Sequence, residues 1–337
     1  MKRFLALAVL TTLFTALIPV ALSARDEDTT EETQQSLDET AETTESASAG
    51  LFSEETVQVF SHIDNTTSEM AMRDYIIGVV AAEMPVEYEK EALKAQALAA
   101  ISYTRYTIAS GKESISTDSG VNQGYRSETD MRADWGDKYE ENYNKIRQAV
   151  TEVENLSLEY EGEPILAAYF ALSAGRTEDA ENIWGKEYAY LKAVPSDGDA
   201  LSPGFETDIS VTADELMEKL KIKTDLNPKD YIGEITATDT GSVTGISVCG
   251  ESFTGEELRA ALALPSPVFT VSADDEIFTF HCKGCGHGVG MSQYGADYMA
   301  RQGANFAEIL LHYYTGAQIV QRNIATFTPE SLSYPEK

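Results

Sequence analysis

The sequence is poor in basic residues and in cysteine. Its 337 residues include 25 Lys and Arg against 56 Asp and Glu, which gives a formal net charge of −31 at pH 7. Nucleic-acid binding needs clusters of Lys and Arg that neutralise phosphates, so this balance argues against a nucleic-acid partner. It argues equally against docking on anionic lipid through a basic patch. Three cysteines are too few for a disulfide scaffold, while a chain of this length buries enough surface for a hydrophobic core.

The first 24 residues have the pattern of an export signal. Lys2 and Arg3 precede an apolar run over residues 4–22, and small residues up to Ala24 close it. The run is also roughly as long as a short membrane span, about 18–20 residues. Residues 1–24 are therefore either a signal peptide that is cleaved, which secretes the protein, or a retained membrane anchor. In both cases we expect the rest of the chain to be exported.

Residues 25–49 are predicted to be a disordered acidic linker. They contain nine acidic residues against Arg25, with no aromatic residue and one leucine. Such a segment cannot bury enough apolar surface to offset its chain entropy. Residues 50–337 then form the exported domain.

Within this domain, helix and strand patterns are mixed. Apolar and helix-forming residues predict helices over 72–84, ended by Pro85, and over 89–106. A hairpin is expected over 157–169, around Glu161 and Gly162. Further helices are expected over 142–153 and 306–314, with short ones opened by the capping boxes that start at Thr212 and Thr254. Strands are expected over 231–238, 243–248, 268–272 and 277–281. Because helices and strands do not alternate regularly, the prediction is an α+β fold, with antiparallel strands and helices around a substrate cleft.

Glu83 is the first candidate for chemistry. It ends an apolar run, and burial among apolar neighbours disfavours a charged carboxylate and raises its pKa. A carboxyl with a raised pKa can act as a general acid near neutral pH. The alternative is a solvated glutamate at a frayed helix end.

A Gly-rich segment over residues 282–296 is the second candidate. His281, Cys282, Cys285 and His287 are of metal-ligand types. The alternatives are a Cys282–Cys285 disulfide or free thiols, a zinc site, and an accidental cluster, and Cys249 is left over in each. Small and hydroxylated residues over 169–178 follow a predicted strand, and they suit either a sugar-lined or peptide-lined cleft or a plain β-turn.

Taken together, these segments resemble the stage II sporulation protein D family (SpoIID/LytB type). The resemblance covers about residues 70–316. It is carried by Ala-Glu-Met-Pro at 82–85, residues 91–97, the Ser-Ala-Gly-Arg-Thr-Glu turn at 173–178 with Trp184, Glu-Leu-Arg at 257–259, residues 286–296 and the ending at Gly316.

The resemblance implies a peptidoglycan lytic transglycosylase of endospore formation. Such enzymes cleave between N-acetylmuramic acid and N-acetylglucosamine, in strands whose stem peptides an amidase has removed, and release 1,6-anhydro products. The implied setting is engulfment, on the mother-cell side of the membrane and facing the wall, with a membrane-bound amidase and an anchoring protein as partners. Two other functions stay open: a non-catalytic glycan-binding scaffold or amidase activator, and, with weaker support, a zinc-dependent hydrolase.

The resemblance also implies a site. Glu83 would be the catalytic acid and base, and the residues expected to line the cleft are Gln96, Arg105, Ser173, Thr177, His287, Ser292 and Gln293. Helix-surface pairing is the alternative for Gln96 and Arg105, and a backbone hydrogen bond is the alternative for His287. No metal or cofactor is expected, because residues 117–125 lack the Cys and His that could hold zinc there in some relatives. Cys282, Cys285 and Ala174 depart from the family pattern.

Overall fold

The computed structural model describes residues 55–274 and 276–322. The predicted signal or anchor and the acidic linker therefore lie outside the described residues. All described residues belong to one unit, Ser48–Lys337. In the part of the chain that is described, no helix is both long enough and apolar enough to cross a bilayer.

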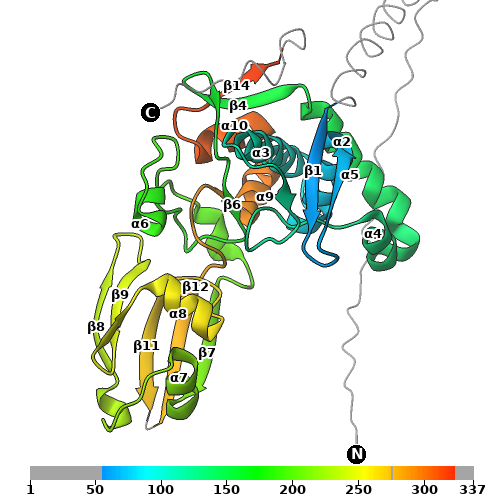
Figure 1. The fold of residues 1–337 in the computed structure, drawn as a ribbon. Coiled ribbons are helices and arrows are strands. Elements are labelled where there is room, and N and C mark those ends of the chain that lie inside the picture. The colour runs from blue at the N-terminus through cyan, green and yellow to red at the C-terminus, as the bar shows by residue number, and fades with distance from the viewer. Residues whose placement is uncertain (1–54, 275, 323–337) are drawn as a thin grey trace, which may run out of the picture. The chain divides into compact units, whose positions relative to one another are not determined.

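A long buried helix organises the first hydrophobic core. This helix, α3 (Lys90–Ala109), packs against α2 (Met72–Glu83), α5 (Tyr139–Val153), α9 (Gln293–Arg301) and α10 (Phe306–Tyr313). Ala95 and Ala99 are fully buried on α3, and their small side chains let neighbouring helices approach closely. Figure 1 shows α9 and α10, from the C-terminal part of the chain, beside α3. The first core thus joins helices from both ends of the described chain.

Short sheets surround these helices. β1 (Thr56–Ser61) and β2 (Thr66–Ala71) form a hairpin that leads into α2, and β3 (Ile115–Ser116) pairs in parallel with β1. β4 (Leu156–Tyr160) lies between β5 (Glu163–Pro164) and β14 (Gln318–Gln321). The remaining elements of this part are α4 (Glu128–Trp135), β6 (Tyr169–Phe170), α6 (Ala180–Trp184), β13 (Met291–Ser292) and the 3₁₀ turns Gly136–Lys138 and Asp197–Leu201.

A second hydrophobic core is built from the segment between these elements. One sheet has the order β11 (Phe269–Asp274), β12 (Ile277–Lys283), β7 (Glu206–Thr212), and the other has the order β10 (Glu251–Phe253), β9 (Val243–Val248), β8 (Ile232–Ala237). Two helices, α7 (Ala213–Leu220) and α8 (Gly255–Leu262), bury Leu216 and Leu258 against these sheets, and the 3₁₀ turn Pro228–Asp230 precedes β8. Figure 1 shows these elements grouped together.

The structure confirms the α+β class and corrects one strand. Both predicted capping boxes are present, with Thr212 accepting from Glu215 N–H and Thr254 accepting from Glu257 N–H. The hairpin predicted to run to residue 169 is shorter, because β5 ends at Pro164, which has no N–H to donate to a ladder. Tyr169 instead pairs in parallel with Met291 of β13.

Candidate active site

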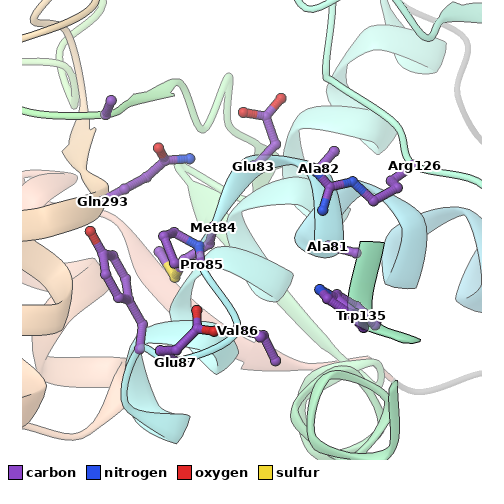
Figure 2. A pocket seen from close by; sticks show the side chains of 12 residues that line it. Ala81, Ala82, Glu83, Met84, Pro85, Val86, Glu87, Arg126, Trp135 and Gln293 are labelled. Atoms are coloured by element: carbon purple, nitrogen blue, oxygen red, sulfur yellow. The ribbon is translucent and has the colours of Figure 1, made fainter. Parts of the chain in front are cut away.

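Glu83 is the last residue of α2. The helix ends there because Pro85 disfavours helical dihedrals at the preceding residue, and Met84 is extended at φ −128° and ψ 134°. The Met84 N–H still closes the last turn by donating to the Val80 carbonyl at 3.1 Å. The Glu83 side chain consequently projects from the helix end into a hollow, as Figure 2 shows.

Burial sets the protonation of Glu83. It raises the pKa of the carboxyl above its ordinary value, and hydrogen bonds from the Gly124 N–H and the Gln293 side chain oppose the shift. The Gly124 N–H donates to Glu83 Oε1 at 2.5 Å. The carboxyl also lies at the negative end of the α2 dipole, which further disfavours a charged carboxylate. This environment favours the protonated form and still offers a donor to the charged form.

The loop that carries Gly124 is docked on α2. The Arg126 N–H donates to the Gly78 carbonyl at 3.0 Å. Tyr125 fills the space above Gly78, where an added Cβ would lie 2.2 Å from the tyrosine ring. A Cβ at Gly124 would lie 2.9 Å from Glu83 Oε1, so a side chain at this position would force the carboxylate to shift.

Two hollows meet at Glu83. One has a volume of about 430 Å³ and the other of about 580 Å³, and both are lined by Ala82, Glu83 and Arg126. The first continues along Tyr88, Trp135 and Gln293, and the second along the β1–β2 turn and the loop that carries Gly124. The carboxyl thus has open space on two sides, which suits a chain-like ligand that passes over it.

One glutamine adjoins Glu83, and a second contacts the first. Gln293 is the first residue of α9 and lines the first hollow, where Figure 2 shows its amide near the carboxyl. Its Nε2 donates to Oε1 of Gln96, a fully buried residue of α3, at 3.3 Å. Among the described residues, Gln96 Nε2 has no hydrogen-bond partner. The structure therefore brings together three of the residues singled out from the sequence.

Ser173 and Ser292 meet at a buried acid. Asp199 accepts from the Ser173 N–H at 2.9 Å and from the Ser292 hydroxyl at 3.0 Å, and burial raises the pKa of its carboxyl. Ser292 also accepts from the Gly295 N–H at 3.2 Å and so caps α9. This network fixes the start of the helix that carries Gln293. Sequence reasoning missed Asp199, since it lies in none of the motifs considered.

Arg105 and Thr177 have other partners. The Arg105 guanidinium pairs with the Glu55 carboxylate at 2.9 Å and donates to the Leu156 carbonyl at 3.1 Å. Thr177 is buried, and its hydroxyl accepts from the Val194 N–H at 2.8 Å. Neither side chain lines the hollows at Glu83. We therefore do not assign a substrate contact to either residue.

His287 lies in an aromatic cluster and lines neither of the hollows at Glu83. Its Nδ1 accepts from the Val289 N–H at 3.1 Å, and its ring contacts Phe170 and Trp184 with centroid separations of 5.6 and 5.3 Å. Burial lowers the pKa of this imidazole to about 4. At neutral pH His287 is therefore a neutral ring held by its own backbone turn.

The cysteines are free thiols. Cys282 is buried, Cys285 is exposed and Cys249 is partly buried, and burial raises the pKa of Cys282 to about 11. The neighbouring His281 bonds instead to Asp208 and Ser272, each at 2.8 Å. Within residues 55–274 and 276–322, no group of three or more His, Cys, Asp or Glu side chains is arranged to hold a metal ion. In the Gly-rich segment, Cys282 and Cys285 are therefore free thiols and do not form a disulfide.

Comparisons with known proteins relate this site to a family. Residues 61–160, which include Glu83 and Gly124, match the family model described as stage II sporulation protein. The chain is 38% identical over 270 residues to "Stage II sporulation protein D" of Bacillus amyloliquefaciens, with 78% of each chain covered. It is 35% identical over 293 residues to the protein of that name in Bacillus subtilis (strain 168), which covers 84% of this chain and 85% of the relative. An "Amidase enhancer" of the same strain is 27% identical over 300 residues, which cover 72% of this chain and 40% of the relative.

Proposed function

The chain belongs to the stage II sporulation protein D family, and from this premise we propose that it is a peptidoglycan lytic transglycosylase that acts in engulfment during endospore formation. The observation that carries the proposal is Glu83, a carboxyl at a broken helix end whose pKa is raised by burial and which faces two open hollows. Proton transfer by one such group is the chemistry that this reaction needs.

Glu83 first acts as an acid. It protonates the glycosidic oxygen between N-acetylmuramic acid and N-acetylglucosamine, and the bond from that oxygen to the anomeric carbon breaks. Glu83 then acts as a base and takes the proton of the muramic acid 6-hydroxyl, whose oxygen attacks the same anomeric carbon. The product is a 1,6-anhydro sugar, and no water is consumed. Because the nucleophile belongs to the substrate and is already near the reacting carbon, no second carboxylate is required.

The surroundings of Glu83 serve both steps. Burial favours the protonated acid that starts the reaction. The Gly124 N–H, 2.5 Å from Oε1, stabilises the carboxylate that forms after the first proton transfer. Gln293, held by Gln96, orients the carboxyl from the other side. We therefore place Gln293 beside the reacting group and Gln96 behind it as a positioning residue.

The hollows suit a glycan strand. Space extends to both sides of Glu83, so sugars can lie before and after the bond that is cut. Tyr88 and Trp135 line the first hollow, and aromatic rings offer apolar faces for sugar rings. The substrate that we propose is a strand from which an amidase has removed the stem peptides.

We place the enzyme outside the cell membrane, on the mother-cell side and facing the wall. The support is the charged start and apolar run of residues 1–24 and the acidic segment over residues 25–49. A membrane-bound amidase and an anchoring protein of the engulfment machinery are the partners proposed. The amidase would supply the peptide-free strands.

The test is a digestion of purified peptide-free glycan strands, with the products identified by mass spectrometry. The wild-type protein should release 1,6-anhydro products, and Glu83→Gln should not. Glu87→Gln is the matched control, because Glu87 lines the same hollow four residues further along. Anhydro products from the Glu83→Gln protein at the wild-type rate would overturn the assignment.

A second function is favoured by the similarity to the amidase enhancer. The chain would then bind glycan and stimulate an amidase without cutting the strand itself. Adding purified Glu83→Gln protein to an amidase assay separates the two functions. Stimulation by this variant, with no anhydro product from the wild type, would favour the enhancer.

A further inference from the structure

One cation stands where the two hollows meet. Among the described residues that line them, Arg126 is the only Lys or Arg. The acidic residues that line them are Glu83, Glu87, Asp118, Asp130 and Asp134. Figure 2 shows the Arg126 side chain beside Ala82, on the same side of the pocket as Trp135. In a chain this acidic, a cation next to the proposed catalytic carboxyl is a candidate for a specific contact.

Arg126 is held at its backbone and weakly engaged at its side chain. Its N–H donates to the Gly78 carbonyl at 3.0 Å, in the same loop whose Gly124 N–H reaches Glu83. Its guanidinium approaches Asp134 at 3.4 Å, longer than a normal hydrogen bond, and the two side chains are 34% and 54% exposed. Exposed pairs of this kind contribute little. The guanidinium therefore retains N–H donors for a ligand in the hollows.

The proposed substrate carries one matching anion. N-acetylmuramic acid bears a lactyl group on its 3-oxygen, and the lactyl carboxyl is a neutral amide while a stem peptide is attached. Removal of the peptide leaves a free carboxylate on the sugar whose anomeric carbon reacts at Glu83. The planar fork of an arginine binds a carboxylate through two parallel hydrogen bonds.

We propose, resting on the proposed function, that Arg126 binds the free lactyl carboxylate of the muramic acid residue at the cleavage site. The contact makes Arg126 a specificity-determining residue that distinguishes peptide-free strands from peptide-bearing ones. The carboxylates of Asp118, Asp130 and Asp134 also favour peptide-free strands, since they repel the additional carboxylates of a stem peptide.

The test is a binding measurement in the Glu83→Gln background, which keeps the ligand intact. The ligands are a peptide-free muramic acid tetrasaccharide and the same molecule with its lactyl carboxyls converted to methylamides. The free acid should bind about tenfold tighter or more, as expected for hydrogen bonds between charged groups. Adding Arg126→Gln should abolish this preference, and Arg126→Lys should retain part of it. Arg132→Gln is the matched control, because Arg132 pairs with Glu128 and lines neither hollow.

The outcomes separate this proposal from the function on which it rests. Equal affinity for acid and amide, or a preference that survives Arg126→Gln in protein with an unchanged circular dichroism spectrum, overturns the role of Arg126. If the wild-type protein still releases anhydro products in that case, the transglycosylase proposal stands. A preference lost only with Arg126→Gln, in a protein that releases no anhydro product, supports the carboxylate contact and overturns the reaction.

Discussion

Glutamates lie at the end of α2 and at the starts of α7 and α8, and their pKa values are shifted in opposite directions. Glu215 and Glu257 are exposed at helix N-termini, where hydrogen bonds from Thr212 and Thr254 lower the pKa of each carboxyl. Glu83 lies at a helix C-terminus, where burial raises the pKa. Charged glutamates at a helix start stabilise the fold, since they satisfy free N–H groups and oppose the dipole.

A glutamate that stabilises a helix therefore differs in protonation from one that is suited to proton transfer. A carboxyl with a lowered pKa at a helix start is charged at neutral pH and has no proton to donate, whereas burial at a helix C-terminus raises the pKa of Glu83 and so favours its protonated form. The fold therefore places Glu83 where its charged form costs stability, a placement that the proposed proton transfer would explain.

Replacing the carboxyl of Glu83 with a group that cannot transfer a proton should have the largest effect on the rate. Glu83→Gln should lower the initial rate of anhydro-product release by about 10²-fold or more, the usual contribution of general acid–base catalysis. Glu257→Gln, at the start of α8, should leave the rate per folded molecule unchanged. Equal losses in the two variants would remove the distinction between the two helix ends.

Asp199 should matter for both stability and rate. Asp199→Ala leaves the buried Ser173 N–H and Ser292 hydroxyl without an acceptor, so the free energy of unfolding should fall by about 2–4 kcal/mol. The rate should fall as well, since Ser292 caps the helix that carries Gln293. Urea denaturation and the glycan assay measure the two effects. An Asp199→Ala protein of wild-type stability would show that the network is not needed.

Gly124→Ala should move the Glu83 carboxylate. The added Cβ would lie 2.9 Å from Oε1, so the carboxylate must shift, and we expect about a tenfold loss of rate, since small misplacements of a reacting group are costly. Gly120→Ala, in the same loop, is the control, because its added Cβ would meet only the Asp118 side chain, with the nearest atom at 3.2 Å. A Gly124→Ala enzyme with full activity would contradict the proposed contact.

The helix caps of the second core should affect stability alone. Thr254→Ala removes the acceptor for the Glu257 N–H and should lower the free energy of unfolding by about 1 kcal/mol. The rate per folded molecule should not change. A specific loss of activity in this variant would indicate that the second core takes part in the reaction.

The smallest expected effect is on the pH dependence of stability. A pKa raised in the folded state means that Glu83 contributes stability below its unfolded pKa, and this contribution is lost as the pH rises through the folded value. Glu83→Gln should therefore melt higher than the wild type near pH 7, with the difference vanishing on acidification. Glu257→Gln should melt lower near pH 7, because its lowered pKa gives stability that is lost as the pH falls. Melting curves at several pH values measure both.

The local parts of the site could be predicted from the sequence. The apolar run and Pro85 mark Glu83 at a helix end, and each Thr-x-x-Glu spacing marks a cap, because these signals lie within a few residues of one another. The Gly124 contact could not be predicted, since it joins residues 41 apart, and the Ser292–Asp199 bond joins residues 93 apart. Tyr169 was assigned to the wrong strand pair for the same reason, since its partner Met291 is remote.

In the proposed reaction, Glu83 transfers protons while the substrate supplies its own nucleophile. Digestion of peptide-free strands in water enriched in oxygen-18, with the products analysed by mass spectrometry, distinguishes this reaction from attack by water. The new muramic acid ends should be 1,6-anhydro and carry no oxygen-18, and Glu83→Gln should not form them. Reducing ends that carry one oxygen-18 atom would mean attack by water, and would contradict the proposed reaction.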